Sequence, residues 1–386
     1  MSALRDLRRH ALHALTQARA TLPAGLNDTI FHLPTGNVQL IEACGRAGVR
    51  PMQLGEQRQG WPTILDGSDP ELTGVLLESC RRSPPDGQHL AATLPSCRIL
   101  GRECTAIAAG GLVLTDVSPD DHSTNRPHRA LATRIMALPP RRLPGITALL
   151  GDVGHRNIFH WFFDILPRAA MLRAAGCPEP DRWVIPKSRL PIVPELLRAA
   201  GVPMERCVHM SPWSHVSCEW LQLTTAPGRI CEPQPHAVHA LRGWLRPTTA
   251  KRSPRLVVIG RRGRRKLANM DALMAALDSY RPTLVHLEGK SLAQQIDALA
   301  GAQCIVGPHG AGLAHMIHAA PGASVIEFLP EHYRNPSFFH LAGACGLRYS
   351  CIRACAAPGA SGSPTTRDLV IDVNHARAIV DRALRD

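Results

Sequence analysis

The chain has 386 residues, of which 45% are hydrophobic and only 4% aromatic, and its formal net charge is +13. This length and composition fit a globular protein with two domains, and no apolar run approaches the roughly 20 residues of a membrane span. The basic surplus favours anionic partners. The few aromatic residues argue against a protein that stacks single-stranded nucleic acid.

The first 150 residues are predicted to be a partly β lead-in that packs on the first domain. Residues 1–22 have the pattern of a basic amphipathic helix and lack the apolar core and cleavage site of a secretory signal. Such a helix either packs on its own domain or makes peripheral contact with an anionic membrane surface. Strand-like pieces follow at Val38–Ile41, Cys97–Leu100 and Leu112–Val117.

From Gly151 onward, short apolar strands alternate with helical patterns, which predicts parallel βα units. A helix begins near Asn157 and contains Pro167, which should kink it or end its first half. His160 and Asp164 lie four residues apart and therefore on one face. A histidine oriented by a carboxylate is a workable general base. The same residues also fit a capping cluster, with Asn157 as the cap and Asp164 solvated.

The proline-punctuated segment 227–254 predicts a domain boundary, which we place at residue 250. The βα alternation then repeats to the end of the chain. The strand Leu256–Ile259 ends in a basic loop, Gly260–Lys266. Ser291 and Gln294 form a capping box at the start of a later helix. A terminal helix, Asn374–Leu384, is expected to cross back to the first domain.

A second strand, Cys304–Val306, runs through the glycine turn 307–312 into a helical pattern. In doubly wound sheets, ligands bind at the carboxyl ends of strands, where helix N-termini offer N–H groups to phosphate. Arginine forks grip phosphate oxygens. We therefore expect arginines of the basic loop to face the same crevice as His309 and Gly310. The alternatives are a tight turn without a ligand and a solvated basic loop.

Glu327 ends the next strand, where a lone carboxylate is costly unless it is paired. A ribose diol or a buried salt bridge to an arginine would satisfy it equally well.

Metal ligands and disulfides are not indicated by the sequence. Twelve cysteines are scattered without a Cys-x-x-Cys pair, so we expect reduced thiols and a cytoplasmic location, which includes the inner face of the membrane. His315 and His318 lie three residues apart, and Cys351 and Cys355 four apart, but neither pair matches a closed metal site. We expect no metal and no resident cofactor.

Taken together, these blocks resemble the glycosyltransferases of family 61 over about residues 150–352. The matching residues are Asn157, His160, Asp164, Leu166 and Pro167; Gly260, Arg261 and Arg262; Ser291, Gln294 and Gln295; the block from Gly307 to Leu313; and Val325, Ile326 and Glu327. The basic block is enlarged here by Arg264, Arg265 and Lys266, which leaves open which arginine grips the diphosphate.

The resemblance implies an α/β fold of the GT-B type, with two Rossmann-like domains facing across a cleft. Residues 151–250 would form the acceptor-side domain and residues 251–386 the donor-binding domain. His160 and Asp164 would be catalytic, and Asn157 would lie on the acceptor side. The implied donor-binding residues are Arg261, Arg262, Ser291, Gln295, His309, Gly310, Ala311, Gly312, Leu313 and Glu327.

The implied reaction is an inverting, metal-independent transfer from a nucleotide sugar, of the uridine-diphosphate type, to a glycan or lipid-linked glycan. Capsular or extracellular polysaccharide synthesis is the expected setting, with no nucleic-acid partner. Two other hypotheses remain. A basic nucleic-acid-binding protein predicts steeply salt-dependent binding to duplex. A catalytically inactive nucleotide- or glycan-binding module predicts the same fold without sugar transfer.

Overall fold

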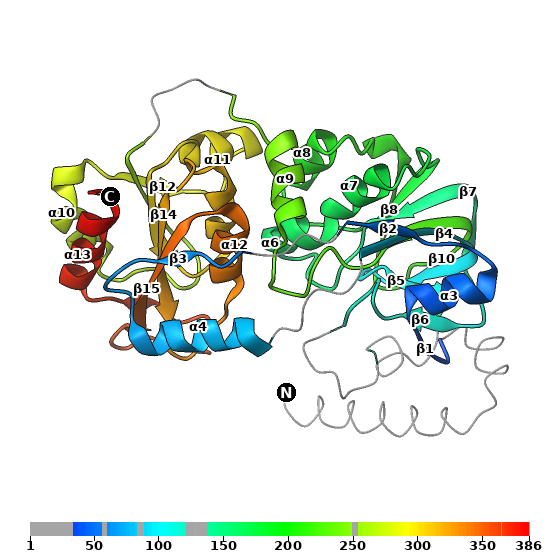
Figure 1. Ribbon diagram of the computed structural model, residues 1–386, viewed down its shortest axis with the longest axis horizontal. Coiled ribbons are helices and arrows are strands. Elements are labelled where there is room, and N and C mark those ends of the chain that lie inside the picture. The colour runs from blue at the N-terminus through cyan, green and yellow to red at the C-terminus, as the bar shows by residue number, and fades with distance from the viewer. Residues whose placement is uncertain are drawn as a thin grey trace. The chain divides into compact units, whose positions relative to one another are not determined.

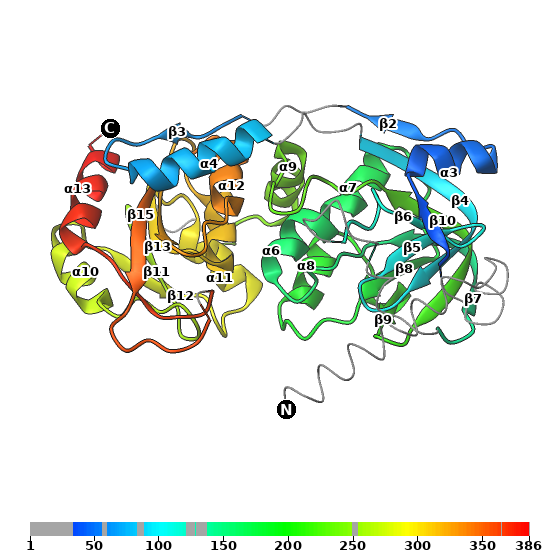
Figure 2. The same cartoon turned by 90° about the horizontal axis from the view of Figure 1, so that it is seen from below.

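The computed structural model describes residues 34–55, 60–82, 89–120, 128, 137–248, 254–363 and 365–385. These residues form two compact units (Figures 1 and 2). The first combines residues 34–55 with the described residues from 89 to 230, and the second combines residues 60–82 with those from 231 onward. The amphipathic helix predicted at residues 1–22 lies outside the described residues.

The first unit is built on a mixed sheet. Its strands are β1 (Gly36–Val38), β2 (Met52–Leu54), β4 (His89–Leu100), β5 (Thr105–Ala108), β6 (Leu112–Leu114), β7 (Arg141–Leu149), β8 (Arg182–Pro186), β9 (Cys207–Met210) and β10 (His215–Thr224). They lie in the order β1-β6-β5-β4-β10-β7-β8-β9, with β2 paired to β4. Strands β10, β7, β8 and β9 are parallel neighbours, as the βα alternation predicted.

The strands that the sequence assigned to a lead-in are part of this same sheet. β4 runs antiparallel to β10 along most of its length, and buried residues of both strands, including Ile99 and Leu221, share one apolar cluster. The strand expected at Val38–Ile41 was wrong in its second half, because Leu40 begins helix α3 (Leu40–Ala47). The Asp116 carboxylate accepts the Leu40 N–H at 2.9 Å and so favours a helix start there.

The second unit is built on a mainly parallel sheet. Its strands are β3 (Thr63–Ile64), β11 (Leu256–Gly260), β12 (Thr283–His286), β13 (Cys304–Pro308), β14 (Ser324–Pro330), β15 (Arg348–Ala356) and β16 (Leu369–Val370). The order is β12-β11-β13-β14-β15-β16, with β3 paired to β15. The neighbours β12, β11, β13, β14 and β15 are all parallel. This confirms the strands that were predicted from their short β-branched runs.

Helices cover both faces of the second sheet. They are α4 (Pro70–Arg82), α9 (Pro235–Trp244), α10 (Met270–Ala276), α11 (Leu292–Leu299), a 3₁₀ helix (Ala311–His318), α12 (Ser337–Cys345) and α13 (Val373–Ala383). In Figure 1, α10 and α13 lie on one side of the strands and α11 and α12 on the other. None of the helices within the described ranges has both the length and the apolar character needed to cross a membrane.

The terminal helix α13 packs within the second unit, and its predicted crossing to the first unit stays a prediction. Ile379 and Val380 of α13 are fully buried in one cluster with Val306 and Ile326 of β13 and β14. The apolar face of the helix is therefore used on the sheet of its own unit.

Residues 60–82 also depart from the sequence prediction, because they belong to the second unit. β3 extends the second sheet beside β15, and Arg353 Nε donates to Asp69 Oδ2 at 3.0 Å. The division between the units lies at Ile230–Cys231, ahead of the predicted boundary at residue 250. Helix α9 accounts for the difference, because it packs on α12.

Candidate functional site

A distorted helix after β7 presents the predicted base. Helix α6 (Ile158–His160) is one turn long and is capped by the Asn157 side chain, which accepts the Phe159 N–H at 3.1 Å. A π-helical turn, Trp161–Ile165, follows, and α7 (Pro167–Ala174) begins at the proline. Pro167 has no N–H to continue the ladder, so the interruption predicted at this residue is confirmed. Wide π turns of this kind recur at functional sites.

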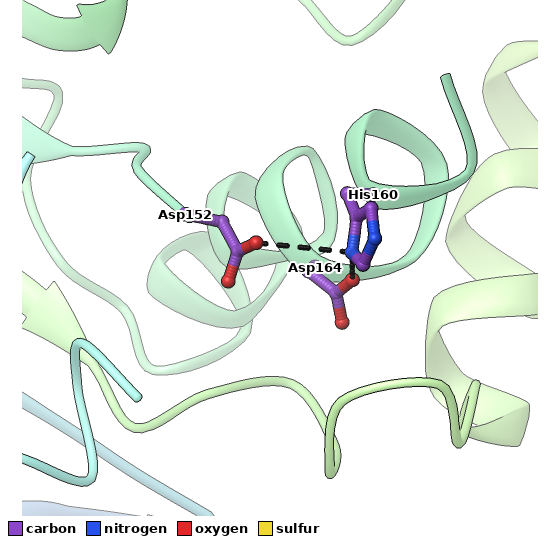
Figure 3. Close-up of side chains that lie close together, drawn as sticks. All are labelled: Asp152, His160 and Asp164. Atoms are coloured by element: carbon purple, nitrogen blue, oxygen red, sulfur yellow. Dashed lines mark hydrogen bonds and ion pairs between the residues drawn. The ribbon is translucent and has the colours of Figure 1, made fainter. Parts of the chain in front are cut away.

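His160 and Asp164 meet within this distorted segment. His160 Nδ1 lies 2.6 Å from Asp164 Oδ2, and the Asp164 side chain is only 8% exposed. Figure 3 marks this contact with a dashed line. Asn157 does cap the helix, but Asp164 is not the solvated residue of the alternative interpretation. A proton on Nδ1 would be donated to the carboxylate, which would leave Nε2 as the ring nitrogen that can accept another.

Asp152, in the loop after β7, was missed by the sequence analysis. Its Oδ1 lies 3.8 Å from His160 Nδ1 and accepts the Gly154 N–H at 2.6 Å. Burial and the nearby Asp164 charge raise the pKa of Asp152 to about 6, against the opposing effect of His160. The sequence feature that could have identified Asp152 is its position directly after a buried strand. The same feature identified the basic loop Gly260–Lys266.

Arg168 lies beneath this cluster and was also missed. Its guanidinium is completely buried and donates to three backbone carbonyls: those of Asp164 at 2.9 Å, Thr224 at 3.1 Å and Val117 at 2.8 Å. Burial lowers the pKa of Arg168, whereas the charges of Asp152 and Asp164 raise it. The arginine therefore joins the π turn to the end of β10 and offsets part of the negative charge.

Asp152, His160 and Asp164 are also the one group within the described ranges that is close enough to share a metal ion. Their candidate ligand atoms all lie within 4.8 Å of one another. The 2.6 Å separation of Nδ1 and Oδ2 is that of a hydrogen bond occupied by a proton. The buried cation of Arg168 also takes up part of the charge that a metal would neutralise. These two observations favour a hydrogen-bonded network in which the three side chains share protons over a site in which they share a metal ion.

In the second unit, the strand order puts a switch point between β11 and β13. The order β12-β11-β13-β14-β15 is the 2-1-3-4-5 pattern of doubly wound sheets, whose ligands bind where the order reverses. Arg261 follows β11 and His309 follows β13. Arg261 Nη1 donates to the His309 carbonyl at 3.0 Å, so the basic loop and the glycine turn meet, as the sequence analysis expected.

Arg265 contributes a second buried guanidinium to this place. Its backbone has a left-handed φ of 57°, and its Cζ lies 5.6 Å from the centre of the Tyr333 ring. Its Nε and Nη1 atoms are buried and have no hydrogen-bond partner among the described residues. Burial, together with the Arg265 charge, lowers the pKa of Arg261 to about 10. Two neighbouring cations, of which Arg265 has unused donors, are suited to bind an anion.

Arg262, the other predicted phosphate ligand, is placed differently. Its side chain is exposed, and its backbone N–H is donated to Glu288 Oε1 at 3.1 Å. The structure therefore pairs Arg261 with Arg265 rather than with Arg262. The sequence left the choice of arginine open. The left-handed backbone of Arg265 sets the direction of the loop, and it cannot be recognised in a run of arginines.

Glu327 is paired with His309 and Tyr349 and not with an arginine, which was one of the partners considered from the sequence. It is completely buried, and its Oε1 meets His309 Nδ1 while Tyr349 donates its hydroxyl to Oε2 at 2.5 Å. Burial and the Glu327 charge raise the pKa of Tyr349 well above its usual range, so the phenol keeps its proton. Both carboxylate oxygens are engaged within the protein, so Glu327 orients His309 from below the turn.

The remaining predicted donor residues shape the turn and the next helix. Ser291 caps α11 and forms the predicted capping box with Gln294, and Gln295 Nε2 donates to the Lys290 carbonyl at 2.9 Å. Ala311 begins the 3₁₀ helix and Leu313 is completely buried. A Cβ on Gly312 would lie 3.2 Å from Ile259, so this glycine permits close packing on β11.

The family model described as glycosyltransferase 61 matches residues 158–326. Over this segment the chain is similar to glycosyltransferase family 61.

Two similar relatives are plant enzymes of this kind. A beta-1,2-xylosyltransferase of Oryza sativa subsp. japonica is 34% identical over 62 residues, which cover 16% of this chain and 12% of the relative. A beta-1,2-xylosyltransferase of Arabidopsis thaliana is 36% identical over 59 residues, which cover 15% and 11% of the two chains. The chain thus matches only a small part of the length of these relatives.

The family 61 segment spans most of both candidate sites. It includes His160, Asp164 and Arg168 in the first unit, and the arginine pair and glycine turn in the second. Asp152 lies outside the matched segment, and Glu327 directly follows it.

Proposed function

We propose that the chain is an inverting glycosyltransferase that moves a sugar from a uridine-diphosphate sugar to a hydroxyl of a glycan acceptor. The observation that carries this proposal is the half-buried pair Arg261 and Arg265 at the switch point of a doubly wound sheet, in a chain that is similar to family 61 over residues 158–326. Such a pair fits the diphosphate of a nucleotide sugar. Because both relatives are named xylosyltransferases, uridine-diphosphate xylose is the first donor to test.

In this proposal the two units act as the lobes of a GT-B enzyme. The second unit holds the donor through Arg261, Arg265 and the turn at His309. The first unit supplies the base and the acceptor side. The division of the chain into two compact α/β units supports this assignment.

The chemical step is a single displacement. The acceptor oxygen attacks the anomeric carbon from the face opposite the nucleotide, and its proton passes to His160 Nε2. Asp164 balances the imidazolium that forms. The bond from the anomeric carbon to the diphosphate oxygen breaks, and uridine diphosphate leaves with the electron pair. The arginine pair neutralises the charge that develops on it, so no metal is required for this role.

The acceptor and setting belong to the same proposal. A glycan or lipid-linked glycan, in polysaccharide synthesis on the cytoplasmic side of a membrane, offers the hydroxyl nucleophile that this step needs. The net charge of +13 would favour approach to an anionic surface or carrier.

A transfer assay tests the proposal. The full chain is incubated with a panel of uridine-diphosphate sugars and oligosaccharide acceptors, and released uridine diphosphate and the mass of the product are measured. We expect turnover with at least one sugar and a loss of about 10²–10⁴-fold in His160→Ala. His209→Ala, at an exposed histidine of β9, is the control and should behave like the natural chain. An inactive natural chain, or full turnover in His160→Ala, would contradict the proposal.

A further inference from the structure

The loop of residues 150–155 after β7 is fixed on several sides around His160. The Leu150 N–H is donated to the Val184 carbonyl at 2.9 Å, which holds the start of the loop to β8. Trp161 Nε1 donates to the His155 carbonyl at 2.7 Å and holds its end to the π turn. The loop therefore has one shape, set by buried contacts.

Gly154 makes room for the histidine ring. A Cβ built on this glycine would stand 2.1 Å from His160 Cγ and 2.3 Å from Cδ2. Gly154 is not among the described glycines with a left-handed φ. Space for the imidazole, rather than backbone conformation, therefore requires glycine here.

The same loop carries the second carboxylate that faces the ring. Asp152 is only 3% exposed at its side chain, and the Gly154 N–H fixes the oxygen that lies 3.8 Å from His160 Nδ1. Asp164 approaches the same ring nitrogen from the π turn, so both dashed contacts in Figure 3 converge on Nδ1. The buried Arg168 bonds to the Asp164 carbonyl and is the cation that moderates this pair of carboxylates.

We propose that Asp152 is a positioning residue for His160: its carboxylate, held by the Gly154 N–H, aligns the imidazole and stabilises the imidazolium formed when the ring accepts a proton. The role rests on the proposed function of His160 as the base. Asp152 lies outside the matched family segment, and Gly154 takes part in the same role because its N–H holds the carboxylate. The physical reason is that a second anion beside Nδ1 favours the charged ring over the neutral one.

The test compares Asp152→Asn with Asp116→Asn. Asn keeps the oxygen that accepts the Gly154 N–H but removes the charge. Asp116 is a matched control, because its charge also acts on Arg168 and burial raises its pKa, yet its side chain accepts the Leu40 N–H instead. Two readouts are used on the full chain: steady-state kinetics, and the ¹⁵N resonances of the His160 ring, assigned by their loss in His160→Ala.

In Asp152→Asn we expect kcat to fall on the order of 10-fold, less than on removal of the base itself, with KM for the donor within about 2-fold. The His160 ring resonances should shift in Asp152→Asn and stay unchanged in Asp116→Asn. Gly154→Ala should displace the ring and lower kcat further, whereas Gly45→Ala, at a site with nothing within 4 Å of the new methyl group, should not.

Unchanged ring resonances in Asp152→Asn would overturn the proposal, as would equal shifts in both aspartate variants. Turnover of the natural chain that a chelator abolishes and Mn²⁺ restores would also overturn it, because the three side chains would then be metal ligands. If no sugar transfer is found, the proposed function fails, but the ring resonances still decide whether Asp152 positions His160.

Discussion

The hydroxyl of Tyr349 lies 2.5 Å from Glu327 Oε2, and both residues are buried beneath the turn that carries His309. Because the other oxygen of Glu327 meets His309 Nδ1, a chain of contacts runs from β15 through β14 to the turn. The position of the glycine turn is thus set by the interior of the sheet as well as by the glycines.

Tyr349→Phe should destabilise the second unit by about 1–3 kcal/mol, because it leaves a buried carboxylate oxygen without a donor. Urea unfolding measures the change in the free energy of unfolding. Tyr280→Phe is the control: Tyr280 donates to Asp381 from a partly exposed position, so water replaces the lost partner and the loss should be smaller. Equal losses in the two variants would contradict the buried role of Glu327.

Much of the second unit was predictable because its strands are short β-branched runs and its turns are marked by glycine and proline. The meeting of the loops after β11 and β13 followed from one rule, that ligands bind at the carboxyl ends of parallel strands. The choice between Arg262 and Arg265 did not follow, because it depends on one left-handed residue in the loop.

The loop after β7 and residues 60–82 were harder to predict, for physical reasons. Asp152 approaches His160 through a loop whose shape depends on tertiary contacts with Trp161 and Val184. The two-residue strand β3 exists only because β15 offers a free edge, so no local pattern in residues 60–82 indicated which unit they join. The one feature of the sequence that could have identified Asp152 is its position directly after a buried strand.

Arg265→Gln should weaken binding of uridine diphosphate by about 10-fold or more, because charge-assisted hydrogen bonds to phosphate contribute about 1.5–3 kcal/mol. Arg262→Gln, at an exposed side chain of the same loop, should change it by no more than about 2-fold. Isothermal titration calorimetry on both variants measures the dissociation constants. A larger loss in Arg262→Gln would assign the phosphate contact to Arg262, one of the two arginines that the family resemblance implied.

Gly310→Ala should lower nucleotide affinity while leaving the fold almost as stable. A Cβ there would stand 1.6 Å from Arg261 Nη1, and the flexible arginine would move away from the His309 carbonyl. The backbone at Gly310 is extended, so alanine adds no conformational strain. Gly263→Ala, in the same region with nothing within 4 Å, is the control. Unaltered affinity in Gly310→Ala would separate the turn from the phosphate site.

Transfer should persist in the presence of excess chelator, because Arg261 and Arg265 supply the positive charge for the leaving diphosphate. Initial rates are compared with and without ethylenediaminetetraacetate, after dialysis of the protein and buffers. The same rates after added Mg²⁺ or Mn²⁺ serve as the control. A rate that falls to background with chelator and returns with Mn²⁺ would show that the chain requires a metal.

Asp152→Asn should make the first unit more stable at neutral pH, although it lowers activity. The folded protein holds a proton on Asp152 up to about pH 6, whereas the ordinary pKa is 3.8, so ionisation disfavours the folded state. This cost is absent below the ordinary pKa, grows as the pH rises from about 4 to about 6, and is fully present above that. Asn does not ionise and escapes it. Thermal unfolding of both proteins at pH 4.5 and pH 7.5 measures the difference, which should be small at the lower pH and favour the variant at the higher. If the variant were less stable by the same amount at both pH values, ionisation of Asp152 would not destabilise the folded protein.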